Sequence, residues 1–338
     1  MLTSKRLYDV LTRKQIYLEG VKLYQEQLFN LVLLDLKNQL TKLFQQLKYK
    51  RLNDMTKGAL IAFIKQLREV QSEVYGKYTT QLFKDLLDFM ETDLEMSKII
   101  FVTLFEDFPN GDAKLKYADL ILEKRNDENK QGVMPVSWLT DNQQRLFSAI
   151  QNAPIPANGI LLFDFINNFV DSASNSIENI VRQGYANADS TEDVFTSIVG
   201  AEELNYKDGQ FNRLYNQNAA LIATVFEHES AIVEAGVASV LFASYVWALG
   251  IAKRHTNICL SRAGNVYIYG QGPLPPAHIG CVSKAIPIIN NDDYEPPESF
   301  QVWANGQPEE VQKEMLTAEE TPLTIKEYKS KLPLILKR

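Results

Sequence analysis

Apolar residues recur at intervals of three, four and seven through the first hundred residues, with Lys, Gln and Asp between them. Between Lys5 and Lys50 this pattern predicts one long amphipathic helix, or two helices joined near Gly20. A helix of this length needs something to cover its apolar stripe, so a protein partner is one interpretation of it.

A second helical run extends to Leu94, and Asn53 or Asp54 is expected to cap its N-terminus. Gly76 is expected to interrupt this run. The heptad pattern is too irregular for a coiled coil, so the two runs predict an antiparallel helical hairpin.

The middle of the chain alternates turns with shorter helical patterns. The sequence FPNG at 108–111 predicts a turn, and the polar run at 123–132 predicts a boundary or a flexible loop. Ser190 and Asp193 form an S-x-x-D capping box, and Gly200 closes the same run. Helices are therefore predicted over 141–151, 160–183 and 191–199.

The last third combines a helical pattern with short β-forming runs. A helix is predicted from about 209 to 238, followed by a buried strand at 240–250 that is rich in aromatic residues. A short strand at 266–269 lies between glycines, and two strands flanking a tight turn predict a β-hairpin. A helix at 307–316 precedes a tail that is expected to dock on a partner as a strand or a helix.

These patterns predict an α+β protein with mainly helical N-terminal two thirds and a small C-terminal α/β module containing the β-hairpin. Four regions are expected: a helical arm at 1–135, a helical middle region at 136–208, a C-terminal domain at 209–316, and a tail at 317–338.

Composition narrows the class of protein. The 338 residues are 45% hydrophobic, as in proteins with a packed core, and no apolar run approaches the roughly 20 residues that span a bilayer. The first residues do not resemble a secretory signal, so a cytoplasm-like compartment is expected and no membrane partner.

Charge is unevenly distributed along the chain. The net charge of -7 argues against general nucleic-acid binding, but residues 1–50 hold nine Lys or Arg against four Asp or Glu. This local surplus indicates a DNA-contacting or partner-binding arm, and the alternative is an ordinary helix with a solvated charged face.

Both cysteines and two of the three histidines fall between 255 and 287. His255 and Cys259 are separated by three residues, and His278 and Cys281 by two, a set that could hold tetrahedral zinc. The first pair is expected on an extended segment and would not converge readily with the second. A Cys259–Cys281 disulfide, or two buried thiols with His278 bonded to the backbone, are the competing interpretations. These rank above zinc, and zinc ranks above a catalytic role.

Motifs of enzymatic chemistry are missing from the sequence. Neither cysteine has a base or an orienting acid at a recognisable offset, and the glycines near 264 and 272 belong to turns rather than to a phosphate-binding loop. His228 lies in FEHES, which lacks the second histidine of a zinc protease, so it is interpreted as a structural or surface residue. The sequence therefore predicts a protein that is not an enzyme.

A series of spaced motifs nevertheless resembles one known family. The series comprises Tyr245, Trp247, Leu249 and Gly250, then Thr256, Cys259, Gly264, Val266 and Tyr267, then Pro275, Pro276, His278, Cys281, Ser283 and Pro287, and finally Trp303 with Gln307 and Pro308. In this order they resemble the C-terminal domain of the phage Mu F-like head morphogenesis (minor head protein) family of tailed bacteriophages. The similarity covers about 209–316. Many members have an additional cysteine near the first, and an arginine where this chain has Val282.

The resemblance implies a non-enzymatic minor capsid protein, made in the host cytoplasm and packaged in the phage head. It implies association with the portal and other head or internal virion proteins, as an oligomer within the virion, in assembly or DNA delivery. Two alternatives stay open: an enzyme of the transferase-like type found fused to such domains, and a DNA-contacting internal virion protein that uses the basic arm.

Overall fold

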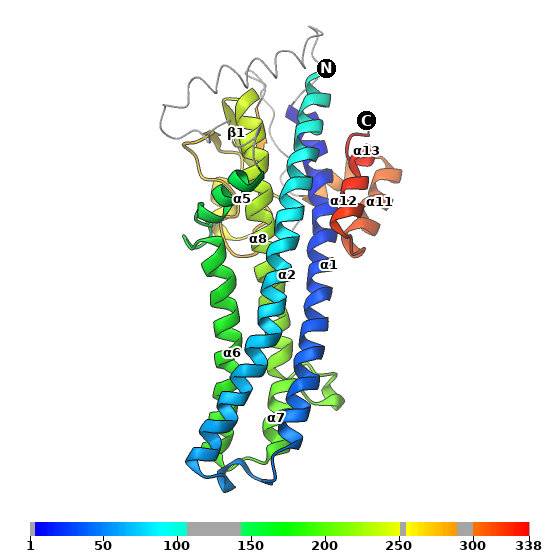
Figure 1. Ribbon diagram of the computed structural model, residues 1–338. Coiled ribbons are helices and arrows are strands. Elements are labelled where there is room, and N and C mark those ends of the chain that lie inside the picture. Colours follow the sequence, from blue (N-terminus) through cyan, green and yellow to red (C-terminus); the bar gives the residue numbers. More distant parts are fainter. Residues whose placement is uncertain (1–3, 107–142, 251–254, 289–299, 338) are drawn as a thin grey trace. The chain divides into compact units, whose positions relative to one another are not determined.

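The computed structural model describes residues 4–106, 143–250, 255–288 and 300–337 (Figure 1). It is mainly helical with one small antiparallel sheet in the C-terminal part, so the predicted α+β class is confirmed. The long helices are α1 (Ser4–Gln45), α2 (Lys57–Glu106), α6 (Leu162–Asn187) and α8 (Gln210–Leu241). The shorter ones are α5 (Gln143–Asn152), α7 (Thr191–Val199), α9 (Asn257–Arg262), α10 (Phe300–Asn305), α11 (Glu309–Glu320), α12 (Ile325–Ser330) and α13 (Leu332–Ile335), with 3₁₀ turns at Leu52–Asp54 and Glu202–Leu204.

The chain forms two compact units, each assembled from separate segments. Unit 1 comprises 1–24, 85–162 and 223–338, and unit 2 comprises 25–84 and 163–222. Helix α2 has 50 residues and is therefore about 75 Å long. This exceeds the length of one small core, so the helix contributes to both units. The four consecutive regions predicted from the sequence do not follow these units.

Unit 2 is a helical bundle with aromatic contacts along its core. Phe29 packs against Tyr78 and Phe169, with ring centroids 5.0 and 5.7 Å apart. Nearer the α1–α2 connection, Phe44 packs edge-on against Phe63 and Phe195. The predicted helical hairpin therefore exists, and α6, α7 and the start of α8 complete its core.

Two details of the hairpin differ from the sequence-based prediction. Thr56, rather than Asn53 or Asp54, caps α2, because its Oγ1 accepts a hydrogen bond from the N–H of Ala59 at 3.2 Å. Helix α2 also continues through Gly76, and α1 continues through Gly20. A single glycine costs a helix only about 1 kcal/mol, which tertiary packing easily exceeds.

Helix α7 begins and ends where its signals predict. Ser190 Oγ accepts a hydrogen bond from the Asp193 N–H at 3.0 Å, and Gly200 adopts a φ of 102° after the last residue.

The predicted turn at 108–111 and the polar run at 123–132 lie outside the described residues.

Substituting two glycines of unit 2 should have opposite effects. A Cβ on Gly209 would lie 2.2 Å from the backbone nitrogen of Gly200, whereas one on Gly76 would meet nothing within 4 Å. We expect Gly209→Ala to destabilise the fold by about 1–3 kcal/mol through steric overlap. Gly76→Ala should stabilise it by about 0.5–1 kcal/mol through helix propensity. Urea denaturation of both variants measures this, and equal effects would contradict it.

The sheet has the order β2-β1-β3, with β1 (Ser244–Ala248) pairing antiparallel to both β2 (Val266–Ile268) and β3 (Lys284–Pro287). The predicted tight-turn hairpin is wrong in its connection, because helix α9 lies between β1 and β2. The predicted strand at 240–250 is shorter than expected, since α8 extends to Leu241 before it.

A network of buried charges occupies the core of unit 1. Lys14 Nζ on α1 lies 2.8 Å from Asp93 Oδ1 on α2 and 2.7 Å from Glu234 Oε1 on α8. Lys22 Nζ lies 2.9 Å from Glu227 Oε2 and 2.8 Å from Glu19 Oε1. Lys14, Lys22, Asp93, Glu227 and Glu234 are all buried. Ionised side chains so far from water persist only as pairs.

Strand β3 and helix α12 join this network. Lys284 Nζ lies 3.3 Å from Glu227 Oε1 and 3.6 Å from Glu234 Oε1, an electrostatic contact without hydrogen-bond geometry. Burial alone would raise the pKa of Glu234, but Lys14 and Lys284 together lower it. Tyr328 donates a hydrogen bond to Asp93 Oδ1 at 2.7 Å. The network therefore ties the sheet and the C-terminal helices to α1, α2 and α8.

The C-terminal segment packs on α1 of the same chain. Arg6 donates hydrogen bonds to the carbonyls of Leu336 and Lys337, and Gly20 O accepts one from the Leu323 N–H at 2.9 Å. A Cβ on Gly20 would lie 2.8 Å from Thr321 O, so only glycine allows this close approach. The tail is thus helical, which is one of the two forms predicted for it.

In the described segments, no helix has the length and apolar character needed to cross a membrane.

Candidate metal site

The site lies in the small module formed by β1, α9, β2 and the loop that leads to β3. Thr256 occupies the N-cap position of α9, so Cys259 lies in the first turn of that helix. The loop after β2 carries His278 and Cys281, and the N–H of Gly280 donates to Thr224 Oγ1 of α8 at 2.9 Å. The module therefore brings together two segments that are eighteen residues apart in sequence.

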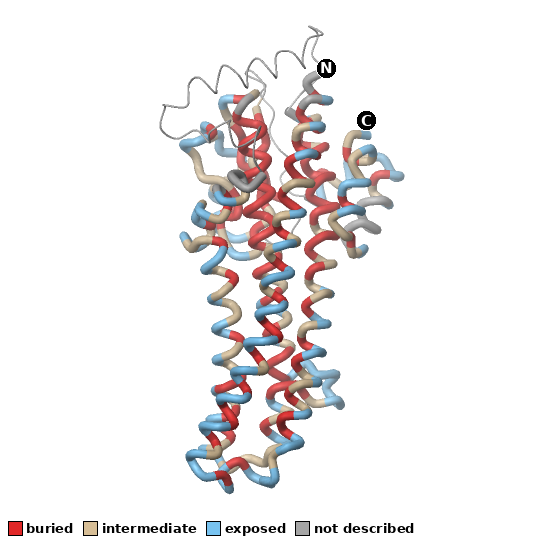
Figure 2. Tube along the Cα trace, in the orientation of Figure 1, coloured by how far each residue is buried: buried red, intermediate tan, exposed pale blue. Residues whose placement is uncertain are grey.

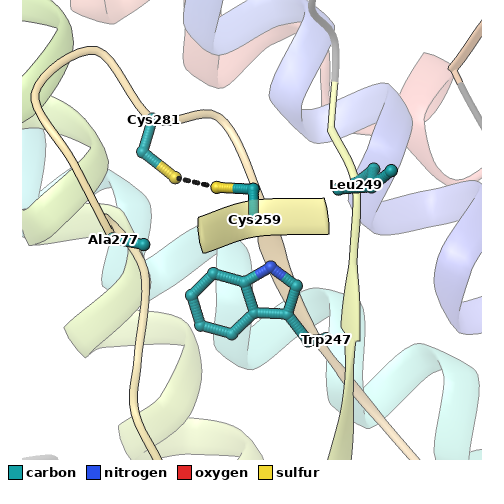
Figure 3. Packing of buried hydrophobic residues seen from close by; sticks show 5 residues of the cluster. All are labelled: Trp247, Leu249, Cys259, Ala277 and Cys281. Carbon is teal, nitrogen blue, oxygen red and sulfur yellow. Dashed lines mark hydrogen bonds between the residues drawn. The ribbon is translucent and has the colours of Figure 1, made fainter. Parts of the chain in front are cut away.

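Cys259, His278 and Cys281 converge at one point. One potential ligand atom from each lies within 4.8 Å of the others. The two sulfur atoms are 3.6 Å apart and face each other in Figure 3. Two thiolates on one tetrahedral zinc ion are about 3.8 Å apart, given zinc–sulfur bonds of about 2.3 Å. The three residues therefore could bind a metal ion.

A backbone contact sets the tautomer of His278. Its Nδ1 lies 2.9 Å from the carbonyl oxygen of Ile279, and because a carbonyl only accepts, Nδ1 must carry the proton. Nε2 then holds a free lone pair, and the bond at Nδ1 fixes the ring as in many metal sites.

The two thiols differ in acidity because they share a hydrogen bond. Bonding to Cys281 outweighs burial and lowers the pKa of Cys259 to about 6. The same bond and burial raise the pKa of Cys281. The pair thus releases its first proton readily, and metal binding requires thiolates. Both cysteines are free thiols and buried, so the disulfide interpretation does not describe this state of the chain.

His255, the fourth predicted ligand, lies outside the 4.8 Å group. Its Nε2 is buried and has no hydrogen-bond partner among the described residues. Burial and then the charge of His278 lower the pKa of His255. The structure therefore brings together three of the four residues and leaves His255 outside the group.

The remaining motif residues support the shape of the module. Gly264 adopts a φ of 77° before β2, and its N–H donates to Trp247 O at 2.9 Å. Pro275 and Pro276 are buried in the loop that carries His278. Trp303, outside the module, donates from Nε1 to Asp9 Oδ1 at 2.7 Å and so helps to fix α10 on α1.

A small apolar cluster surrounds the sulfur atoms. It consists of Trp247, Leu249, Cys259, Ala277 and Cys281, with Ala263 and Tyr267 packed against it (Figure 3). Because both sulfurs are buried here, they are poorly placed to attack a substrate, and the arrangement suits metal binding better than nucleophilic catalysis.

The buried charges of unit 1 were not predicted from the sequence, although a signal existed. Lys14 lies three residues after Leu11 and four before Leu18, which is a position in the apolar stripe. His228, predicted as structural or surface, is buried, and burial lowers its pKa to about 4.

No protein-family model, no curated protein and no solved structure matches this chain.

Proposed function

We propose that this chain is a non-enzymatic minor head protein of a tailed bacteriophage, with a C-terminal module held together by zinc. The observation that carries the proposal is the convergence of Cys259, His278 and Cys281 within 4.8 Å. These three residues belong to the motif series through which the sequence resembles phage Mu F-like minor head proteins. The three residues whose side chains meet are thus among those that carry the resemblance.

Zinc suits this set of ligands better than other common metals. Thiolate and imidazole groups favour zinc, whereas magnesium and calcium prefer oxygen ligands. Cys259, His278 and Cys281 would hold the ion, and His255, with its buried and unpartnered Nε2, is the candidate fourth ligand. A site closed by four protein ligands is structural rather than catalytic.

The helical part supports a role in assembly. Leu31 and Leu34 of α1 are 62% and 52% exposed, although both are large apolar residues one helical turn apart. Two neighbouring exposed leucines offer a small apolar surface that a protein partner could cover. In a head protein the partners would be the portal and other internal virion proteins, and the chain would act as an oligomer in the virion.

Mass spectrometry of purified particles tests this role. Particles of the phage that encodes this chain should contain it in few copies relative to the major capsid protein. Particles assembled without the gene should lack it and show a defect in assembly or DNA delivery. Complete absence of the chain from wild-type particles would overturn the proposal, and normal yield and infectivity without the gene would overturn a role in assembly or delivery.

A further inference from the structure

Positive charge is concentrated in one short segment around the α1–α2 connection. Residues 42–68 contain seven Lys or Arg and a single acidic residue, Asp54, which gives the segment a charge of +6. The whole chain carries -7, so the remaining residues carry -13. A local surplus of this kind attracts a polyanion to this segment.

The structure separates this segment from the rest of the basic N-terminal arm. Arg13, Lys14 and Lys22 are buried in unit 1, and Lys37 lies over the ring of Tyr206 at 4.4 Å. They are therefore unavailable to an external partner. Of the basic residues in 1–50, those at the end of α1 and just after it are the ones exposed together.

Five cations at the connection are exposed and form no ion pair in the described part of the chain. They are Lys42, Lys48, Lys50, Arg51 and Lys57. They lie in the last turn of α1, in the loop and at the first residue of α2. This connection is at the lower end of Figure 1, and Figure 2 shows many exposed positions there.

The nearby carboxylates bond to other groups and do not pair directly with these cations in the described residues. Asp54 accepts a hydrogen bond from the backbone N–H of Arg51 at 3.3 Å, and Asp193 interacts with Ser190 at the cap of α7. Asp189 lies in the neighbouring α6–α7 connection and Glu192 in the first turn of α7, and the backbone of Asp189 and Thr191 bonds to Leu52 and Lys50. Counted against Asp54, Asp189, Glu192 and Asp193, the five cations keep a net charge of +1, and none of the five forms an ion pair with these carboxylates in the described residues.

Helix stability does not explain the charge at the start of α2. Lys57 is its first residue, and its first turn contains no acidic residue. A cation there is disfavoured by the helix dipole, by about 0.3–1 kcal/mol. A bound anion would reverse this unfavourable interaction.

We infer that the surface formed by Lys42, Lys48, Lys50, Arg51 and Lys57 binds the phosphate backbone of duplex DNA without sequence preference. Its composition favours DNA over a protein partner, because lysine is depleted in protein interfaces and frequent at phosphates. Only Tyr49 and Ile61 are exposed large apolar residues in residues 42–68. The inference goes beyond the proposed head role, and either can fail alone.

Fluorescence anisotropy with the full chain and a labelled duplex of about 30 base pairs tests this, at salt concentrations from about 50 to 200 mM. The test variant combines K48Q, K50Q, R51Q and K57Q. The matched control removes the same charge from exposed positions elsewhere, with K84Q, K207Q, R213Q and K326Q. Circular dichroism confirms that both variants fold.

The test variant should bind at least about tenfold more weakly at low salt, and its salt slope should fall by about three to four. The control should bind like the wild type, and a second duplex of unrelated sequence should bind equally well. Three results would overturn the inference: no binding by the wild type at low salt, equal losses in both variants, or competition by polyglutamate as effective as by DNA. The last would assign the surface to an acidic protein.

Discussion

Replacing Lys14 by methionine is expected to lower the free energy of unfolding by about 3–5 kcal/mol at neutral pH. Lys14 is 1% exposed and pairs with both Asp93 and Glu234. Its removal leaves these two carboxylates in the core of unit 1 with fewer cations, and Ser97 Oγ loses its contact with Lys14 Nζ at 3.0 Å. An uncompensated buried charge costs more than the lost pair contributes. Urea denaturation followed by circular dichroism measures the difference.

An exposed lysine provides the matched control. Lys65 lies 4.0 Å from Glu69, and both side chains are largely exposed. Lys65→Met should change stability by less than about 0.5 kcal/mol, because exposed pairs contribute little. A similar loss in both variants would contradict the buried network.

The effect of Lys14→Met should also depend on pH. In the wild-type protein burial raises the pKa of Glu234, but Lys14 and Lys284 outweigh burial and lower it. A lowered carboxyl pKa contributes stability above the unfolded value of about 4.3, and this contribution is lost as the pH falls through the folded value. In the variant Glu234 lacks the support of Lys14, so the difference in stability from wild type should shrink as the solution is acidified.

Local signals in the sequence predicted the helices well, because they act over a few residues. The capping box at Ser190 and Asp193 indicated the start of α7 and Gly200 its end, and the spacing of apolar residues indicated α1 and α8. Gly76 was misinterpreted because its cost of about 1 kcal/mol is small beside the packing of a long helix.

The pairing of distant segments could not be predicted in the same way. The sequence pattern indicated strand β2 and predicted that a tight turn connects it to its partner strand. The partner is β1, and helix α9 lies between the two strands in the chain. Cys259 was expected on an extended segment, and its place on α9 is what carries it to His278 and Cys281. This convergence depends on tertiary packing, which cannot be predicted from the number of residues between the ligands in the sequence.

The buried charges link the candidate metal site to the helices. Lys284 follows Cys281 by three residues and contacts Glu227 and Glu234 of α8. Ion pairs of this kind add little net stability compared with apolar packing, but they specify one arrangement of the groups involved. We therefore expect the network to fix where strand β3, and with it the loop of Cys281, attaches to the bundle.

Removing the proposed zinc ion should unfold the module around residues 255–287 while the helices stay intact. The apolar cluster of the module has five buried members, and two of them are the cysteines. If zinc is bound, a core this small should depend on it, because zinc binding supplies on the order of 10 kcal/mol in small zinc modules. Hydrogen exchange should become fast in 255–287 after treatment with a strong chelator, and the near-ultraviolet signal of Trp247 should weaken.

Ligand variants separate zinc binding from simple burial of the thiols. Elemental analysis should find about one zinc per chain in the wild type and far less in Cys281→Ser and His278→Ala. Ser261→Ala, an exposed change on α9, is the matched control and should keep its zinc. His255→Ala should lower zinc affinity if this residue is the fourth ligand, and unchanged affinity would exclude it. A wild-type chain without metal, with two titratable thiols and unchanged protection of 255–287, would contradict the site. In that case, the 3.6 Å contact between the sulfurs would be explained by core packing alone.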